Sequence, residues 1–502
     1  MRARLRKLAR PIAVYLIALI GLCVLAGPKR LLEPSHDNHY SHMAQSWLAG
    51  RLHHEGKPPG WCAPERAHAK QAKRGGEETE ATTSAAKPKK PCRQHTYDDW
   101  ARVWTIELRD GSSFRGFPCK TTACEQLRRQ GIEGWLVTGS HELREIERRE
   151  IVRRTETWYV SFPPGPALAL LPAVAIRGTA APDVLITCLF AALIPVVFLL
   201  WFDRERGREA GLGREHLWAA AAWTFASPAA FVGAHGRVWF TAQVFGALCL
   251  TLYLASGWKL RRPGLAGLFL GLAVACRPHL AFALPFFMTE WWRVASGRRR
   301  WEAALRFAIP LAIVGAVLMT LNYLRFDDPL EFGHRYLDIR WQKRMQEVGM
   351  FSTEYLGRNL RCAFSLLPVW REGPWDGRLP RVSLHGSSIL LGAPWVLALL
   401  WARDRCPQRW GLLVSALAVA LPSLLYQNSG QIQFSYRFAI DWLPMILAAI
   451  VFGGGARRPY FAILVGLGAV WQLYGAWLFG RRPGQLFVTD PLGWPFEDEL
   501  GG

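Results

Sequence analysis

Acidic residues are scarce in this sequence relative to basic ones. Its 502 residues include 39 Asp and Glu against 61 Lys and Arg, which gives a formal net charge of +22. Hydrophobic residues nonetheless make up 51% of the chain, and Trp occurs 24 times. This composition excludes a disordered chain and does not fit a simple soluble enzyme.

Long apolar runs account for the hydrophobic content. The runs at 184–202, 238–257 and 460–480 approach the length of about 20 residues with which a helix crosses a bilayer. Most Arg residues flank such runs and do not form a single-sign patch on a soluble domain, so we expect no nucleic-acid partner. The positive-inside rule explains these charges, because Lys and Arg beside a span fix its orientation. The sequence therefore predicts a multi-pass membrane protein.

About eleven spans are expected. Their boundaries are 11–27, 182–202, 216–234, 238–257, 264–277, 279–292, 301–323, 387–402, 410–426, 438–453 and 460–479. The first follows a basic segment and resembles a signal peptide, but no clear small-residue cleavage site follows it, whereas further spans do. We interpret it as an uncleaved first helix.

The charges also predict a topology. With the amino end in the cytoplasm, the Arg-containing connections 203–215, 258–263, 293–300, 403–409 and 454–459 all lie inside. This scheme treats 264–292 as two short legs that turn at Arg277-Pro278, because Pro breaks helical hydrogen bonding and Arg is costly in lipid. It treats 163–177 as an interfacial or half-inserted helix, because that segment is short for a crossing. The opposite face then gathers 28–181, 235–237, 277–279, 324–386 and 427–437, which hold most of the unusual polar residues.

We therefore expect an all-α polytopic protein of the cytoplasmic (inner) membrane, with about 11 transmembrane helices and a small α/β or disordered extracytoplasmic insert. The expected division is a first helix at 1–27, a first extracytoplasmic loop at 28–181, a transmembrane core at 182–323, a second extracytoplasmic loop at 324–386, C-terminal helices at 387–480 and a tail at 481–502.

The first external loop begins with an expected amphipathic helix. Ser35 or Asp37 can cap it, apolar residues recur at helical spacing, and Gly50 ends it. Residues 62–95 contain no Ile, Leu, Val, Met or aromatic residue, so we expect them to be disordered. Apolar and polar residues alternate over 103–108 before Asp110-Gly111, which predicts a hairpin. A small folded insert is expected at 96–160.

Cysteine usage suggests cross-links in this loop. Four of the ten cysteines, Cys62, Cys92, Cys119 and Cys124, lie within it. In an oxidising outer compartment they can form two disulfides in any of three pairings. Free thiols and a metal site are the alternatives, although the spacing matches no zinc motif closely.

A series of motifs, in order along the chain, resembles one family. Asp-Asn-His-Tyr at 37–40 is followed by Phe-Pro-Pro-Gly-Pro at 162–166, and further matching segments lie at 235–242, 271–278, 322–326, 329–336 and 433–441. This order resembles the polytopic GT-C glycosyltransferases, specifically the bacterial members of the dolichyl-phosphate-mannose protein mannosyltransferase-like group (family 39). The resemblance runs from about residue 30 to 450. The insert at 60–155 departs from compact members of the group and leaves the acceptor open.

The resemblance implies a GT-C-like fold and an inverting transferase. Such enzymes move a sugar from a polyprenyl-phosphate donor to a glycan, lipid or protein acceptor at the outer membrane face. Asp37 matches the position of the carboxylate that takes the acceptor's proton. Fixed Arg groups would stabilise the departing lipid phosphate. The ranked candidates are Arg277, Arg335 and Arg437, followed by Arg237 and Arg325.

Other polar residues on the same face are candidates for substrate binding: Tyr40, His235, His279, Glu331 and Tyr436. Asp441 stands four residues after Arg437, so on one helical face it can pair with that Arg, orient it for phosphate, or do both. The His residues are interpreted as interfacial hydrogen-bonding groups and not as metal ligands. No cofactor is required by this reading, and a divalent cation stays open because some relatives with pyrophosphate donors use one.

Several alternatives stand beside these assignments. Asp37 is also a candidate helix cap, with Asp327, Asp328 and Glu331 as other candidate bases, and Arg277 can instead snorkel to the surface. A lipid-linked polymer ligase shares the donor chemistry. A transporter or flippase of lipid-linked sugars fits a helix broken at Arg277-Pro278, but the halves show no convincing inverted repeat. A membrane assembly protein without catalysis is the remaining reading.

Overall fold

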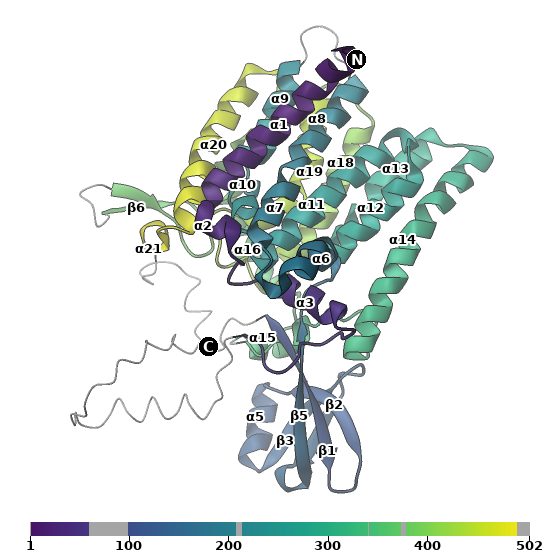
Figure 1. The fold of residues 1–502 in the computed structure, drawn as a ribbon, viewed down its shortest axis with the longest axis vertical. Helices are drawn as coiled ribbons and strands as arrows, with labels where there is room; N and C mark the ends of the chain where they lie inside the picture. Colours follow the sequence, from purple (N-terminus) through teal and green to yellow (C-terminus); the bar gives the residue numbers. More distant parts are fainter. Residues whose placement is uncertain (1, 60–98, 207–212, 340, 373–377, 489–502) are drawn as a thin grey trace. The chain divides into compact units, whose positions relative to one another are not determined.

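The computed structural model describes residues 2–59, 99–206, 213–339, 341–372 and 378–488. The segment expected to be disordered, 62–95, lies outside these residues, as do Cys62, Cys92 and the tail from 489 onward. The chain forms two compact units (Figure 1). The helical unit comprises 1–45, 163–321 and 348–502, and the insert unit comprises 46–162 and 322–347.

Among the described residues, five helical segments are long and apolar enough to cross a membrane: Leu8–Ala26, Asp183–Glu205, Val238–Leu260, Gly297–Phe326 and Pro459–Phe479. They belong to α1 (Arg2–Ala26), α7 and α8 (Asp183–Ala191, Leu193–Arg206), α11 (Val238–Gly257) with η3 (Trp258–Leu260), α14 (Gly297–Phe326) and α20 (Pro459–Phe479). The bent pair α9 (Gly213–Phe225) and α10 (Ala229–His235), with an angle of 55°, makes a sixth candidate. The expectation of a mostly helical, multi-pass membrane protein is thus confirmed.

Five to six candidate spans are fewer than the eleven expected from hydropathy. The remaining apolar segments fold as shorter pieces: α12 (Pro263–Cys276), η4 (Pro278–Ala283), α13 (Leu284–Val294), α17 (Ile389–Gly392), η7 (Pro394–Trp401), α18 (Gln408–Leu424), η8 (Arg437–Asp441) and α19 (Leu443–Phe452). Pro278, Pro394 and Pro444 stand at the starts of η4, η7 and α19. Proline lacks the backbone N–H that would continue a preceding helix, so these apolar runs fold as separate short pieces.

The expected break at Arg277-Pro278 is present. Helix α12 ends at Cys276, and Arg277 has extended backbone angles of φ −149° and ψ 104° before η4 begins. The short helix expected at 163–177 is α6 (Gly165–Arg177), which ends at Gly178 with φ +56°. A positive φ favours glycine, which explains the stop at this residue.

The other described elements are short: α2 (Pro28–Leu32), α3 (His39–Leu48), η2 (Gly178–Ala180), η5 (His334–Tyr336), α15 (Gln342–Glu347), η6 (Thr353–Tyr355), α16 (Leu356–Phe364), η9 (Gly455–Arg457), α21 (Pro483–Leu486) and the antiparallel pair β6 (Val369–Glu372) and β7 (Arg378–Arg381). Helix α3 confirms the helix expected before Gly50.

Ion pairs join the five connections that the charge pattern assigns to one side. Glu205 lies 3.3 Å from Lys259 Nζ and 2.8 Å from Arg261 Nε. The backbone N–H of Lys259 donates to Glu290, which also pairs with Arg293 at 3.0 Å. Arg457 lies in the connection 454–459. It contacts Asp404 in 403–409 and Glu215 in 203–215, and so links the remaining two connections to the first. A few carboxylates therefore link the basic loops of the helical unit to one another.

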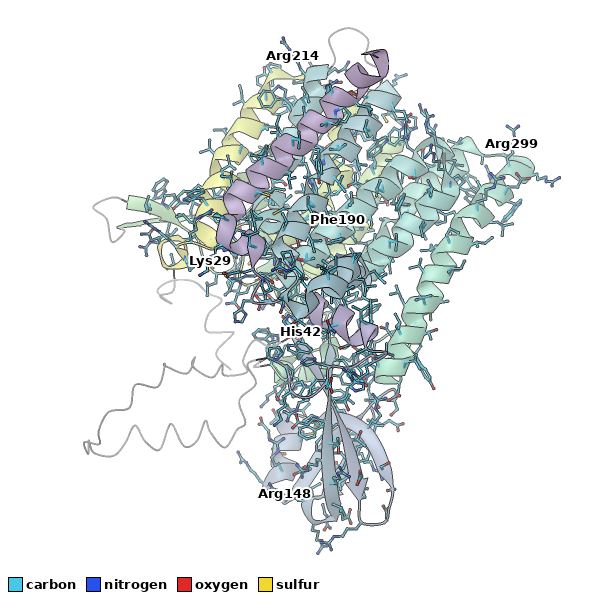
Figure 2. The ribbon with its side chains drawn as sticks, in the orientation of Figure 1. Lys29, His42, Arg148, Phe190, Arg214 and Arg299 are labelled. Carbon is cyan, nitrogen blue, oxygen red and sulfur yellow. A yellow bond between two sulfur atoms is a disulfide. The ribbon has the colours of Figure 1, made fainter. Side chains whose placement is uncertain are left out.

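Two labelled residues mark the ends of the helical unit. Arg214 lies near the amino end of α1, whereas Lys29 lies just past its carboxyl end (Figure 2). The amino end of α1 is held by Arg10, whose Nη1 lies 3.4 Å from Asp203. Lys29 and Arg214, which the charge pattern assigns to opposite sides, thus lie near different ends of α1 (Figure 2).

The insert unit contains a five-stranded antiparallel sheet in the order β4-β3-β2-β1-β5. Its strands are β1 (Trp100–Leu108), β2 (Ser113–Pro118), β3 (Ile132–Val137), β4 (Leu143–Glu147) and β5 (Ile151–Val160), with α5 (Thr122–Arg129) after β2 and η1 (Arg148–Glu150) before β5. The hairpin predicted at Asp110-Gly111 joins β1 to β2, and Gly111 takes φ +83° there. A small antiparallel insert is therefore confirmed.

Alternation along β1 builds a core on each face of the sheet. Ile106 and Leu108 pack with Trp135 and Ile146 on one face, as the alternation predicts. Val103 packs on the other face in a cluster that includes residues from the second loop: Ala101, Phe117, Tyr159, Phe326 and Tyr336. Residues 322–347 thereby complete the insert unit, although they are far from the sheet in sequence.

A disulfide closes the start of α5. Cys119 and Cys124 are bonded, and both side chains are buried. Thr121 caps α5 by accepting a hydrogen bond from the N–H of Cys124. Of the cross-links expected in this loop, the bridge between Cys119 and Cys124 is observed, and the other two cysteines lie outside the described residues.

Candidate functional site

Asp37 lies in a short connection between α2 and α3 that is fixed on both sides. Upstream, the N–H and Oγ–H of Ser35 donate to Asp183 at 2.7 and 2.5 Å. Downstream, the Asn38 amide donates to the Thr179 carbonyl at 2.8 Å. Asp183 is buried at the first turn of α7. The position of Asp37 is therefore set by helices that follow it by more than a hundred residues.

The Asp37 residue itself contacts the start of α11. Its carbonyl accepts a hydrogen bond from Val238 N–H at 3.1 Å. Its carboxylate Oδ2 lies 3.7 Å from Arg237 Nε, and Oδ1 lies 3.3 Å from His36 Nδ1. The side chain is 15% exposed, so it is largely withdrawn from solvent.

The surroundings of Asp37 favour its ionised form. Burial by itself raises the pKa of a carboxyl, because it disfavours the charge. The hydrogen bond from His36 and the positive charges of Arg237 and His39 outweigh that effect, so the pKa of Asp37 lies below its usual value. The result is a partly buried, negatively charged group at neutral pH.

A second polar cluster brings together three of the predicted residues. Arg277 Nε and Nη2 lie 3.0 and 2.9 Å from Oδ2 of Asp441, and His279 Nε2 lies 3.1 Å from the same oxygen. Asp441 is 1% exposed. Its second oxygen, Oδ1, has no hydrogen-bond partner among the described residues. The Arg277 side chain is thus fixed by an ion pair and does not extend freely toward a surface.

The expected ion pair between Arg437 and Asp441 is wrong. Both residues are described, and Asp441 faces Arg277 and His279 instead. The cause is local geometry, because 437–441 is the 3-10 helix η8, where residues four apart do not share one face as they do in an α-helix. The side chain that Asp441 holds in place is therefore Arg277 and not Arg437.

Arg437 is buried and held by polar groups of the helical unit. Its Nε donates to the Gly430 carbonyl at 3.1 Å, and its Nη1 donates to Gln243 Oε1 at 3.4 Å. Its guanidinium lies 5.1 Å from the ring centre of Phe438, and that of Arg277 lies 5.7 Å from the same ring. Phe438 therefore connects the two highest-ranked arginines of this unit.

Three further predicted substrate contacts are buried in the helical unit. Tyr40 and Tyr436 are 2% and 1% exposed. His235 is 4% exposed, and its Nδ1 donates to the Phe231 carbonyl at 2.5 Å. The structure thus places these side chains within the packed protein, where direct stacking on a bulky ligand needs a rearrangement.

The remaining candidates belong to the insert unit. Glu331 is buried and lies 3.1 Å from Arg335 Nε, while the Arg335 side chain is 54% exposed. Arg325 is buried and donates to Asn322 Oδ1 at 2.8 Å and to the Val160 carbonyl at 3.4 Å. Arg325 and Glu331 thus serve the packing of their own unit, and Arg335 presents the accessible guanidinium there.

Asp327, an alternative base, is held by the insert unit. Arg115 Nη1 donates to both of its oxygens at 2.8 and 2.9 Å, and Thr138 Oγ1 donates at 2.6 Å. Both carboxylate oxygens of Asp327 are therefore engaged within its own unit.

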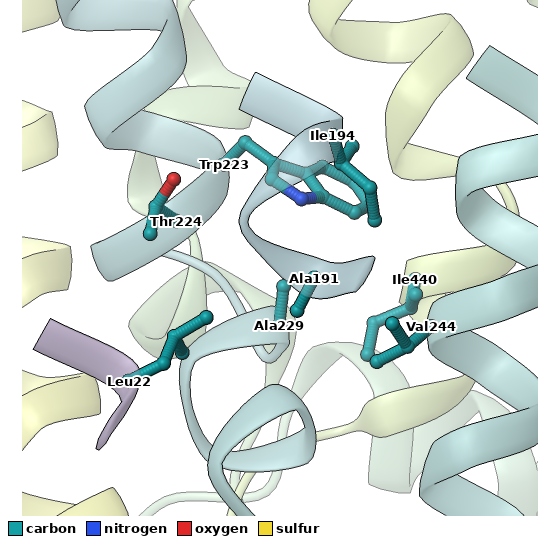
Figure 3. A pocket seen from close by; sticks show the side chains of 8 residues that line it. All are labelled: Leu22, Ala191, Ile194, Trp223, Thr224, Ala229, Val244 and Ile440. Carbon is teal, nitrogen blue, oxygen red and sulfur yellow. The ribbon is translucent and has the colours of Figure 1, made fainter. Parts of the chain in front are cut away.

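The described residues offer few other places for a ligand. No group of three His, Cys, Asp or Glu side chains among them is arranged to hold a metal ion. A small, mostly apolar cavity lies between α1 and the neighbouring helices (Figure 3). Its lining is Leu22, Ala191, Ile194, Trp223, Thr224, Ala229, Val244 and Ile440, which includes no charged side chain.

The sequence reading did not identify Ser35, Asn38 or Asp183 as partners that hold the Asp37 connection. A signal was present for Asp183, because an acid at the first position of a long apolar run is unusual. Its partner could not be inferred, since Ser35 and Asp183 are 148 residues apart in the chain.

Comparison with known proteins adds no further assignment. Among protein-family models, curated proteins and solved structures, none matches this chain.

Proposed function

We propose that this protein is an inverting glycosyltransferase of the GT-C type, which moves a sugar from a polyprenyl-phosphate donor to an acceptor at the outer face of the cytoplasmic membrane. The observation that carries the proposal is Asp37: a carboxylate with a lowered pKa, fixed beside Arg237 just past the end of the first candidate span. The order of motifs from 37–40 to 433–441 supports the same reading.

Asp37 has the properties that a general base of this reaction needs. An acceptor hydroxyl is a weak nucleophile, and a carboxylate that takes its proton speeds attack by about a hundredfold to ten-thousandfold. The acceptor oxygen forms a bond to the anomeric carbon while the bond to the donor phosphate breaks and its electron pair leaves with the phosphate. The acceptor's proton passes to Asp37. Asp37 is charged before the reaction, so it is ready to accept that proton.

Charge that develops on the leaving phosphate calls for fixed cations. Arg277 and Arg437, whose guanidiniums both lie near the ring of Phe438, are the candidates in the helical unit, and Asp441 positions the first of them. The unpartnered Oδ1 of Asp441 is available to a sugar hydroxyl, which would relieve the cost of a buried acceptor without a donor. Arg335 is the accessible candidate of the insert unit.

Mass spectrometry of envelope glycans from cells that carry wild type or Asp37→Asn tests the proposal. The amide cannot take a proton, so the sugar modification should fall at least a hundredfold. Asp110→Asn is the matched control, because Asp110 is an exposed aspartate of the insert hairpin. Unchanged glycans in Asp37→Asn cells with normal protein levels would overturn the proposal.

A flippase of lipid-linked sugars is the second candidate, favoured by broken helices. The pair α9 and α10 bends by 55°, and α12 ends at Arg277 before a second short leg. Reconstituted protein separates the two readings. A flippase moves a fluorescent polyprenyl-phosphate sugar between leaflets without an acceptor, whereas a transferase leaves it in place and consumes it when the acceptor is added.

A further inference from the structure

Three arginines from distant parts of the helical unit meet at the carboxyl end of α20. Arg30 lies in α2, Arg237 precedes α11 and Arg481 follows α20. A Cβ atom on Gly480 would overlap the guanidinium of Arg30, so that guanidinium rests directly on the glycine. The guanidinium of Arg237 lies 5.5 Å from the ring centre of Phe479, the preceding residue.

Arg481 is fixed between α1 and α20. Its Nη1 and Nη2 donate to the carbonyls of Leu25 and Val24 at 2.6 and 2.9 Å, and its guanidinium lies 3.8 Å from the ring centre of Trp477. It therefore caps the free carbonyls at the end of α1. This anchoring holds a cation beside the other two without a carboxylate.

The charges of the cluster are not balanced by the chain. Among the described residues, Asp37 is paired with Arg237 at 3.7 Å, whereas Arg30 and Arg481 have no carboxylate within ion-pair distance. Burial lowers the pKa of Arg30, and the charges of Arg481 and Arg237 lower it further. Three guanidiniums and one carboxylate leave an excess of two positive charges. Like charges held together in this way are costly unless an anion joins them.

A buried acceptor faces the same region. The ring of His235 packs edge-on against the ring of Phe479, with a distance of 4.9 Å between the ring centres. The guanidinium of Arg237 packs against the same Phe479 ring. Since Nδ1 donates to the Phe231 carbonyl, Nε2 carries a lone pair, and this buried atom has no partner among the described residues. Nε2 is thus a buried acceptor beside the cluster that the described residues leave unused.

The cluster lies where candidate spans end. α1 ends at Ala26 and α20 ends at Phe479, within a few residues of Arg30 and Arg481. The outer faces of these helices are apolar and exposed: Ile20 is 60%, Val24 56%, Val470 72% and Trp477 47% exposed. In a bilayer, apolar side chains of this kind lie against acyl chains and the span ends lie at the headgroups.

We propose that Arg30, Arg237 and Arg481 bind the phosphate of an anionic membrane lipid whose chains lie along α1 and α20. A phosphomonoester carries up to about two negative charges at neutral pH and so matches the excess of the cluster, unlike the single charge of a phosphodiester. Arginine is suited to the role because it donates in pairs to phosphate oxygens. The site does not depend on the transferase proposal.

Native mass spectrometry of the full chain from nanodiscs tests the site. The nanodiscs contain phosphatidylcholine alone, with phosphatidic acid, or with undecaprenyl phosphate, and a further arm adds inorganic phosphate. Wild type should retain phosphomonoester lipid in preference to phosphatidylcholine. The monoester lipid that is retained more strongly identifies the source of the phosphate. If the protein retains its lipid unchanged when inorganic phosphate is added, the result supports a lipid as the ligand. Complete displacement of the lipid by inorganic phosphate would overturn the assignment to a lipid.

Two variants address the cluster directly. Gly480→Ala displaces Arg30 by overlap, and Arg30→Gln removes its charge, so each should weaken retention by about tenfold. Gly466→Ala is the matched control, because it makes the same change in α20 where a Cβ would meet nothing within 4 Å. Equal retention by Gly466→Ala, Gly480→Ala and Arg30→Gln would overturn the proposal.

Asp37→Asn separates this site from the proposed reaction. Removing that carboxylate raises the positive excess, so lipid retention should persist or increase while sugar transfer is lost. If Asp37→Asn keeps both transfer and retention, the transferase proposal alone is contradicted. If Asp37→Asn loses retention although its positive excess is increased, the lipid site is contradicted.

Discussion

Arg277 and Asp441 form an ion pair across 164 residues of sequence, with Nε and Nη2 of the arginine 3.0 and 2.9 Å from one carboxylate oxygen. Neither residue lies in a regular α-helix: Arg277 separates α12 from η4, and Asp441 ends η8. The pair therefore joins two places at which apolar runs are interrupted. It explains how the chain holds charged groups within a largely apolar unit.

This pair should contribute strongly to stability. Asp441→Asn leaves the Arg277 charge without its partner and should lower the free energy of unfolding by about 3 kcal/mol. Thermal and denaturant unfolding of the detergent-solubilised protein measures the change. Glu302→Gln is the control, because its partner Arg298 is 93% exposed and such pairs contribute about 0.5 kcal/mol. Similar losses in both variants would show that the buried pair is not special.

The lowered pKa of Asp37 predicts an acid-dependent contribution to stability. A carboxyl with a lower pKa in the folded state stabilises the protein at pH values above its unfolded pKa, and this stabilisation is lost as the pH falls through the folded pKa. The difference in unfolding free energy between wild type and Asp37→Asn should therefore be constant from about pH 7 to pH 5 and should shrink below about pH 4. Comparison of the two proteins cancels the titration of other carboxyls.

Arg237→Gln should shift that loss to higher pH. The variant removes one of the positive charges that lower the pKa of Asp37, so the carboxyl takes up its proton earlier on acidification. Unfolding measured across the same pH series gives the midpoint. Arg299→Gln, at an exposed position, should leave it in place. A midpoint that does not move in Arg237→Gln would remove that arginine as the partner.

The disulfide of the insert unit should resist labelling until it is reduced. In a parent with Cys62→Ser and Cys92→Ser, maleimide should modify Cys119 and Cys124 only after a reductant is added. Reduction should also destabilise the insert unit by about 2 kcal/mol, because a short closed loop is released in the unfolded chain. Mass spectrometry counts the labels and denaturant unfolding measures the loss. Full labelling without reductant would reject the bond.

The charge-based topology predicts opposite accessibility for two surface positions. In intact spheroplasts, a membrane-impermeant maleimide should label Lys29→Cys at once and Arg214→Cys only after permeabilisation, because these residues lie near different ends of α1 (Figure 2). Labelling above that of the parent protein is the readout. The reverse pattern would invert the orientation, and labelling of both from outside would reject the scheme.

Local sequence patterns were sufficient for much of the architecture. The span at 238–257 and α11 share their boundaries, Gly50 follows α3, and the alternation before Asp110-Gly111 gave a hairpin with Ile106 and Leu108 inside. These features depend on residues close together in the chain. Fewer described helices qualify as full-length candidate spans than the eleven expected, because prolines divide several apolar runs into shorter pieces.

The partners of the charged residues required the tertiary structure. The sequence placed Arg437 and Asp441 on one face of an α-helix. They instead lie in a 3-10 helix, where they point in different directions, and the distant Arg277 pairs with the Asp441 carboxylate. The support of Asp37 by Asp183 and the approach of Arg30 to Gly480 were equally invisible.

The sequence by itself determined that the chain is apolar enough for a membrane, which connections carry the positive charge, and where a hairpin forms in the first loop. Only the tertiary structure decided which carboxylate each arginine meets and where arginines are left without one. The physical reason is range. Hydrophobic period and turn chemistry act between neighbours in the chain, whereas an ion pair forms between whichever charges the packing of many helices brings within a few ångströms.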